Sequence, residues 1–87
     1  MDDLIKFKKL LVLNKVTLEK DADSKISTIL IGNDYDQDGN SVSGIVISYK
    51  NPVKSGTFNI IKIIETLANQ KCDWFRFSPK GLFLFFS

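Results

Sequence analysis

The clearest pattern of apolar and polar residues in the sequence lies between Thr57 and Gln70. Apolar residues recur there at intervals of three and four, which places them on one side of a helix with about 3.6 residues per turn. These residues are Ile60, Ile63, Ile64, Leu67 and Ala68. Isoleucine is a mediocre helix former, so packing must supply most of the stability of this helix. We therefore expect the helix to lie on a sheet, with a hydroxyl of Ser55 or Thr57 capping its first turn.

Shorter patterns predict one further helix and five strands. A helix is expected over Asp2–Leu11, because Leu4, Phe7 and Leu11 share one face. Strands are expected where apolar and polar residues alternate or where β-branched residues gather. The predicted strands are Val12–Lys20, Lys25–Ile31, Val42–Lys50, Trp74–Ser78 and Leu82–Phe86. The predicted loops on either side of the third strand are Gly32–Ser41 and Asn51–Gly56.

The predicted order of elements is α-β-β-β-α-β-β, which indicates the α+β class. Short turns between the first three strands favour an antiparallel meander, after which the long helix crosses over and the last two strands join the same sheet. The expected architecture is a small two-layer sandwich, with a mainly antiparallel sheet and the helices on one face. The pattern leaves the order of the strands within the sheet open.

Composition and charge indicate the number of domains, the kinds of partner and the cellular compartment to expect. The 87 residues are predicted to form a single domain, 1–87, with the charged and apolar fractions of an ordinary globular protein. A net charge of +2 does not by itself indicate a nucleic-acid or membrane partner. Cys72 is the only cysteine, so no internal disulfide can form, which fits a reducing compartment. No basic segment followed by an apolar run lies near Met1, and the longest apolar run, Leu82–Phe86, is far too short to span a bilayer. We therefore expect a cytoplasmic protein.

Aromatic residues gather in the last predicted hairpin. They are Trp74, Phe75, Phe77, Phe83, Phe85 and Phe86. The final strand is apolar on both faces, so both faces need a cover. One interpretation makes this strand central in the sheet, with the first helix covering its second face. The other leaves an apolar patch for a partner or a second copy of the chain, and Arg76, the only arginine, anchors that contact.

Negative charge is concentrated in Asp34–Gly39, where aspartates alternate with other residues and a glycine follows. This spacing resembles the first half of an EF-hand calcium loop, with Asp34, Asp36 and Asp38 as ligands. The resemblance then ends, because the twelfth position is Ile45 rather than glutamate. Two other interpretations are a solvated hairpin tip and a projection that docks into the basic cleft of a nucleic-acid enzyme. The loop carries −3, so the rest of the chain carries +5 against a total of +2.

Several kinds of chemistry are excluded by the residues themselves. The sequence contains no histidine, so Ser-His and Cys-His nucleophile pairs and histidine metal sites cannot form. Cys72 is interpreted as a small apolar filler, and no P-loop or dinucleotide-binding glycine pattern is present. We therefore expect no enzyme activity and no cofactor. A nucleic-acid-binding alternative uses Phe75 and Phe77 as a stacking platform beside a basic patch. The lysines of that patch are Lys6, Lys8, Lys9 and Lys15.

The best hypothesis from the sequence is a small non-enzymatic protein-binding module that acts as a stoichiometric inhibitor. A toxin-neutralising immunity protein and a phage or mobile-element antagonist of a host defence enzyme both fit it, with a nuclease or toxin as partner. The hypothesis rests on the acidic loop and the aromatic hairpin, and the hairpin also offers a route to a homodimer. The predicted partner-binding residues are Asp34, Tyr35, Asp36, Asp38, Trp74, Phe75, Arg76 and Phe77. A weak cation site at the three aspartates and a small nucleic-acid-binding domain are the alternatives.

Overall fold

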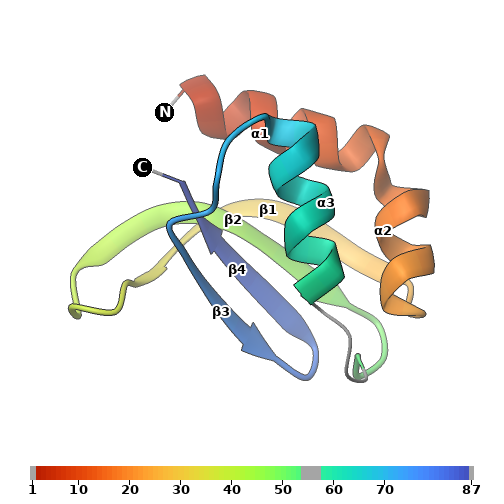
Figure 1. Cartoon of the computed structure of the whole chain (residues 1–87). Coiled ribbons are helices and arrows are strands. Elements are labelled where there is room, and N and C mark those ends of the chain that lie inside the picture. Colours follow the sequence, from red (N-terminus) through yellow and green to blue (C-terminus); the bar gives the residue numbers. More distant parts are fainter. Residues whose placement is uncertain (1, 54–57, 87) are drawn as a thin grey trace.

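The computed structural model describes residues 2–53 and 58–86, and these ranges contain three helices and four strands. The strands form one antiparallel sheet in the order β1-β2-β4-β3, and the helices pack on one face of it (Figure 1). The predicted α+β class and antiparallel sheet are confirmed. None of the described helices combines the length and apolarity needed to cross a membrane. The elements are α1 (Asp2–Leu13), α2 (Lys15–Ala22), β1 (Ile26–Tyr35), β2 (Ser41–Tyr49), α3 (Phe58–Ala68), β3 (Trp74–Ser78) and β4 (Gly81–Phe85).

The predicted helix over Thr57–Gln70 is observed as α3, and its apolar stripe faces the sheet. Ile60 and Ile64 are 0% and 1% exposed, and Ile61 is also buried. The expected capping hydroxyls of residues 55 and 57 lie outside the described residues. The remaining apolar residues of the stripe are partly buried and pack against the same core. Packing against the sheet therefore offsets the weak helix propensity of the isoleucines.

Helices α2 and α3 end in the same way. Each is followed by a residue in the left-handed region, with φ of 51° at Asp23 and 52° at Asn69. The next backbone N–H donates to the carbonyl oxygen of Glu19 in α2 or of Glu65 in α3, in both cases at 3.2 Å, as in a Schellman motif. The carboxylates of these two glutamates also accept a backbone N–H seven residues further on, at 2.6 and 2.7 Å. Each glutamate therefore holds the start of the following segment against its helix.

The predicted strand Val12–Lys20 is wrong, because α1 runs through its first two residues and α2 occupies most of the rest. Leu18 is 0% exposed in the core, whereas Val16 is 63% exposed. Residues two positions apart share one face of a strand and would be buried together. On a helix, residues two positions apart lie on nearly opposite sides. The alternation read from the sequence spans too few residues to separate the two structures. The expected three-stranded meander is therefore absent from the described chain, and α2 packs against α3 instead.

The predicted loop Gly32–Ser41 is shorter than expected. Strand β1 continues through Tyr35, and β2 already begins at Ser41, which pairs with Tyr35. Asn33 and Asp34 have low strand propensity, so the sequence pattern ends before them. The uninterrupted ladder between β1 and β2 extends the strand beyond that point and leaves a turn of residues 36–40.

Strand β4 lies inside the sheet between β2 and β3, as one of the two interpretations expects. Leu84 and Phe86 belong to the core beneath the helices, and the ring of Phe86 lies 5.0 Å from that of Phe7 in α1. Phe83 points to the opposite face, which we call the open face, and it is nevertheless only 4% exposed. The expectation that the first helix covers this second face is wrong, since α1 lies on the same side as the other helices (Figure 1).

Phe83 is covered by strand β2. The ladder between β2 and β4 stops at Ile45, and residues 32–44 continue as a curved two-stranded hairpin, which we call the distal ribbon (Figure 1). A Cβ on Gly44 would lie 2.8 Å from the ring of Phe83 and would overlap the carbonyl oxygen of Leu84. Glycine is therefore required where the ribbon crosses β4.

The burial of Tyr49, at the end of β2, can be tested through the pH dependence of stability. It is 3% exposed, and its hydroxyl has no hydrogen-bond partner among the described residues. Burial, and secondly the charge of Asp21, raises the pKa of Tyr49 from 10.0 to about 12. The folded state thus holds this proton more tightly than the unfolded chain does. The resulting stability is fully present below pH 10 and is lost as the pH rises from 10 to about 12.

We expect the free energy of unfolding to fall across that pH interval by about 2 kcal/mol more in the wild type than in Tyr49→Phe. Urea denaturation at several pH values measures this difference, and Tyr35→Phe, which changes a ring that is 57% exposed, is the matched control. At pH 7, Tyr49→Phe should be at least as stable as the wild type, because it removes a buried hydroxyl that has no described partner. Identical pH dependence of the free energy of unfolding in the wild type and Tyr49→Phe would contradict the burial of this hydroxyl.

Candidate functional site

The tip of the distal ribbon is a tight, hydrogen-bonded turn. Oδ1 of Asp36 accepts the backbone N–H groups of Asp38 and Asn40, each at 2.9 Å. The backbone closes the same turn, because the Asp36 N–H donates to the Asn40 carbonyl oxygen at 2.9 Å. Gly39 has a φ of 82°, a conformation that favours glycine. The interpretation of this segment as a hairpin tip is confirmed, and the Asp36 carboxylate is fixed within it.

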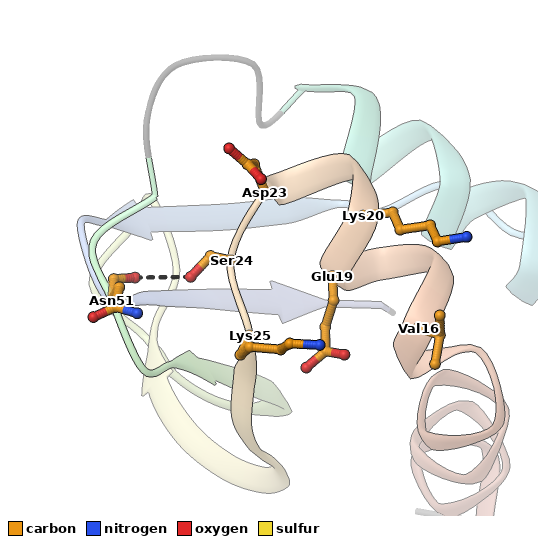
Figure 2. Close-up of a pocket in the computed structure, with 7 residues that line it drawn as sticks. All are labelled: Val16, Glu19, Lys20, Asp23, Ser24, Lys25 and Asn51. Atoms are coloured by element: carbon orange, nitrogen blue, oxygen red, sulfur yellow. Dashed lines mark hydrogen bonds between the residues drawn. The ribbon is translucent and has the colours of Figure 1, made fainter.

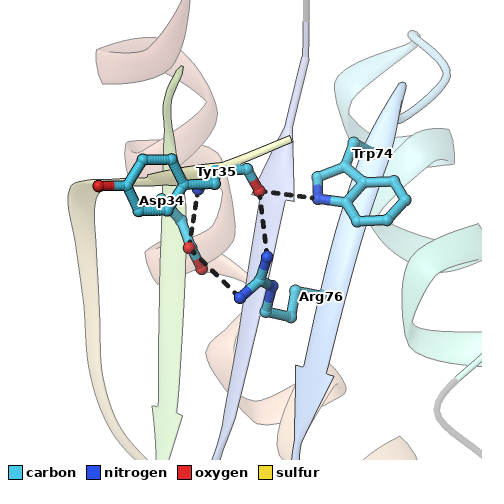
Figure 3. A network of polar contacts seen from close by, with 4 residues as sticks. All are labelled: Asp34, Tyr35, Trp74 and Arg76. Carbon is cyan, nitrogen blue, oxygen red and sulfur yellow. Dashed lines mark hydrogen bonds and ion pairs between the residues drawn. The ribbon is translucent and has the colours of Figure 1, made fainter. Parts of the chain in front are cut away.

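The ribbon reaches across the open face to β3 (Figure 3). The carbonyl oxygen of Tyr35 accepts hydrogen bonds from Nε1 of Trp74 at 3.2 Å and from Nη2 of Arg76 at 3.4 Å. Nη1 of Arg76 lies 3.7 Å from Oδ1 of Asp34. In a flat sheet β1 and β3 would be roughly 14 Å apart, because two strands separate them. These contacts therefore require the ribbon to fold over β4.

The ion pair in this network acts mainly by positioning the ribbon. The side chains of Arg76 and Asp34 are 51% and 28% exposed, and a pair so exposed to water contributes only about 0–1 kcal/mol. Three contacts at one point nevertheless restrict where the tip can lie. The ring of Tyr35 points away from Trp74 and is 57% exposed (Figure 3). We call Asp34, Asp38, Trp74 and Arg76 the ribbon face.

The side chains of the aromatic hairpin point to both faces of the sheet. The register of β3 with β4 places Trp74 and Arg76 on the open face and Phe75 and Phe77 on the face toward the helices. Phe75 packs against the core, while Phe77 is 39% exposed. Asp34, Tyr35, Trp74 and Arg76 are thus brought together, but Phe75 and Phe77 do not join them. The expected stacking platform of these two phenylalanines is also wrong, because Phe75 contributes to the core.

The three aspartates of the acidic segment serve different purposes. Asp34 contacts Arg76 and accepts the backbone N–H of Tyr35 at 2.7 Å, whereas Asp36 closes the turn. Within residues 2–53 and 58–86, no three or more acidic, cysteine or histidine side chains are grouped so that they could hold a metal ion. The expected weak cation site at Asp34, Asp36 and Asp38 is therefore not formed in this structure.

Cys72 lies between α3 and β3 and is partly buried. Its Sγ donates to the carbonyl oxygen of Trp74 at 3.0 Å, and the carbonyl oxygen of Phe85 lies 3.5 Å away. Burial raises the pKa of the Cys72 thiol. The protonated thiol is a weak nucleophile, and here it packs against the core as the sequence interpretation expects.

A pocket of about 370 Å³ lies at the corner between α2 and β1 (Figure 2). Several of its polar groups hold this corner together. The Glu19 carboxylate accepts the backbone N–H of Ile26, and the hydroxyl of Ser24 donates to the carbonyl oxygen of Asn51 at 3.0 Å. These hydrogen bonds stabilise the reversal of the chain after α2. The polar groups that line the pocket therefore have a structural role.

Gly44 is the important position that the sequence analysis did not single out. An isolated glycine inside a strand pattern commonly marks a bulge or the close approach of another backbone, so a signal was present. Gly32 lies directly opposite Gly44 in the ladder, which marks the same point on both strands.

Comparisons with models of known families, with curated proteins and with solved structures give no match to this chain.

Proposed function

We propose that the protein is a small non-enzymatic protein-binding module that acts in the cytoplasm as a stoichiometric inhibitor of a nuclease or toxin. The observation that supports this proposal is the acidic tip, which hydrogen bonds hold beside Trp74 and Arg76 on the open face. A tip that is already ordered loses little conformational entropy when it binds. Tryptophan and arginine are also the residue types that most often dominate binding energy at protein interfaces.

Charge indicates the kind of surface that this tip would meet. Asp38 is exposed, and its carboxylate forms no hydrogen bond or ion pair with the residues in the described ranges. Together with Asp36 it gives the end of the ribbon a negative charge that complements a basic surface, such as the substrate cleft of a nucleic-acid enzyme. Binding of this kind weakens as salt concentration rises.

Asp38→Lys is the variant that tests this surface with least effect on the fold. Reversing the charge of Asp34 would place a cation beside Arg76, and reversing Asp36 would remove the acceptor that closes the turn. The partner is first captured on the immobilised full chain from cells that carry the gene and is then purified. We expect an equimolar amount of the chain to abolish the partner's activity. We expect Asp38→Lys to raise Kd at low salt at least about tenfold, or about 1.4 kcal/mol.

Asp21→Lys is the matched control. Asp21 is exposed on α2, and its reversal changes the net charge by the same amount. Helix α2 lies at the opposite end of the molecule from the distal ribbon (Figure 1). This variant should bind as tightly as the wild type. An unchanged Kd for Asp38→Lys would remove the ribbon face from the proposal, and a partner that keeps its full activity when saturated would remove the inhibitor function.

A further inference from the structure

A second candidate binding surface lies along α1, on the helix-covered side of the sheet. A groove of about 550 Å³ runs between this helix and the edge strand β1. Five of its lining residues are spaced by three and four along α1 and form one stripe. Leu4 and Leu11 of the same helix face the core, so α1 is apolar on two sides. The groove is lined by Ile5, Lys8, Lys9, Val12, Leu13 and Ile31.

Half of the eight exposed large apolar side chains in the described ranges line this groove. Of the other four, Val16 lies on the first turn of α2, Leu30 pairs with Val46 and points to the open face, and Tyr35 and Phe77 lie elsewhere. Leu13 is 82% exposed. Single exposed apolar residues are normal, but a contiguous patch usually marks an interaction site. The four residues that line the groove are Ile5, Val12, Leu13 and Ile31.

The strand beside the groove offers a free edge. β1 pairs with β2 on one side only, and its ladder is regular from Thr28 to Tyr35. Natural edge strands are usually protected by lysine, proline, a bulge or short length. β1 spans ten residues, contains no lysine or proline, and has its single irregularity at its start. Its outer backbone groups can therefore pair with an added strand, and the groove can take side chains from that strand.

The charge of the groove indicates which partner it would take. The residues that line the groove include Lys8 and Lys9 and no acid, and within the described chain neither lysine forms an ion pair. A twofold interface presents the same patch from both subunits, so a second copy would bring these lysines close to one another. An acidic partner would instead be complementary.

We propose that an extended segment of a partner protein, rich in apolar and acidic residues, adds to the outer edge of β1. Its apolar side chains fill the groove along α1, and its carboxylates pair with Lys8 and Lys9. This surface is separate from the ribbon face, so the proposal does not rest on the inhibitor function. It gives the domain a second docking site with the opposite charge preference.

A phage-displayed library of random 12-residue peptides, selected on the immobilised full chain, tests this proposal. We expect the enriched peptides to combine apolar residues at alternate positions with acidic residues. For a synthetic copy of an enriched peptide, Lys8→Glu/Lys9→Glu should raise Kd at least tenfold. Lys71→Glu/Lys80→Glu, which reverses two exposed lysines elsewhere and changes the net charge equally, should leave Kd within about twofold.

NMR of the wild type gives a readout that does not depend on the variants. Binding of the peptide should shift the amide signals of β1 and α1 and slow hydrogen exchange along residues 27–33. Enriched peptides without acidic residues, equal losses in both lysine pairs, or shifts centred on the ribbon face would overturn the proposal. So would a dimer that forms through β1 in sedimentation, or binding to anionic lipid vesicles that the charge reversal abolishes.

Discussion

Gly44→Ala is expected to lower the free energy of unfolding by about 3 kcal/mol or more. The added Cβ would overlap the carbonyl oxygen of Leu84, which belongs to the backbone of β4 and cannot rotate away. It would also press on the ring of Phe83 at 2.8 Å. Relief would require the distal ribbon to lift off β4, which would expose Phe83 and separate Tyr35 from Trp74. Urea denaturation followed by the fluorescence of Trp74, the only tryptophan, measures the change.

Two comparisons make this prediction specific. Gly39→Ala introduces a side chain with nothing within 4 Å but with a φ of 82°, so it should cost only about 1–2 kcal/mol. Adding Phe83→Ala to Gly44→Ala removes the ring but leaves the backbone overlap, so it should not restore stability. If Gly44→Ala is as stable as the wild type, the ribbon does not cross β4 at this position.

Leu18→Ala is expected to lower the free energy of unfolding by about 2–5 kcal/mol, because Leu18 is 0% exposed and joins α2 to the core. Val16→Ala should change it by no more than about 0.5 kcal/mol, since Val16 is 63% exposed. Both substitutions shorten an aliphatic side chain and lie two residues apart. On a strand the two residues would share a face. Similar losses of stability at both sites would therefore support the predicted strand Val12–Lys20 and contradict helix α2. Chemical denaturation of the two variants distinguishes the structures.

The two predicted surfaces prove to be parts of one arrangement, which the sequence does not reveal. The acidic segment and the aromatic hairpin are each recognisable from local composition. Their meeting depends on hydrogen bonds between Tyr35 and residues 39 and 41 positions further along the chain. Those bonds form only because the ribbon curves at Gly44, and curvature of a sheet is set by packing between strands rather than by local propensity. The division of the hairpin into two faces likewise follows from its register with β4.

The sequence by itself determined α3, the α+β class, the positions of the last two strands and the absence of histidine chemistry. These features depend on residue identity and on a strong local period, which hold in any fold of the chain. Tertiary structure alone decided that Leu18 belongs to a helix, that β1 continues through Asn33 and Asp34, and that Phe83 is buried on the open face. Short apolar patterns suit a helix and a strand almost equally well. The larger free energy of burial and strand pairing therefore selects between them, and it depends on residues far away in the chain.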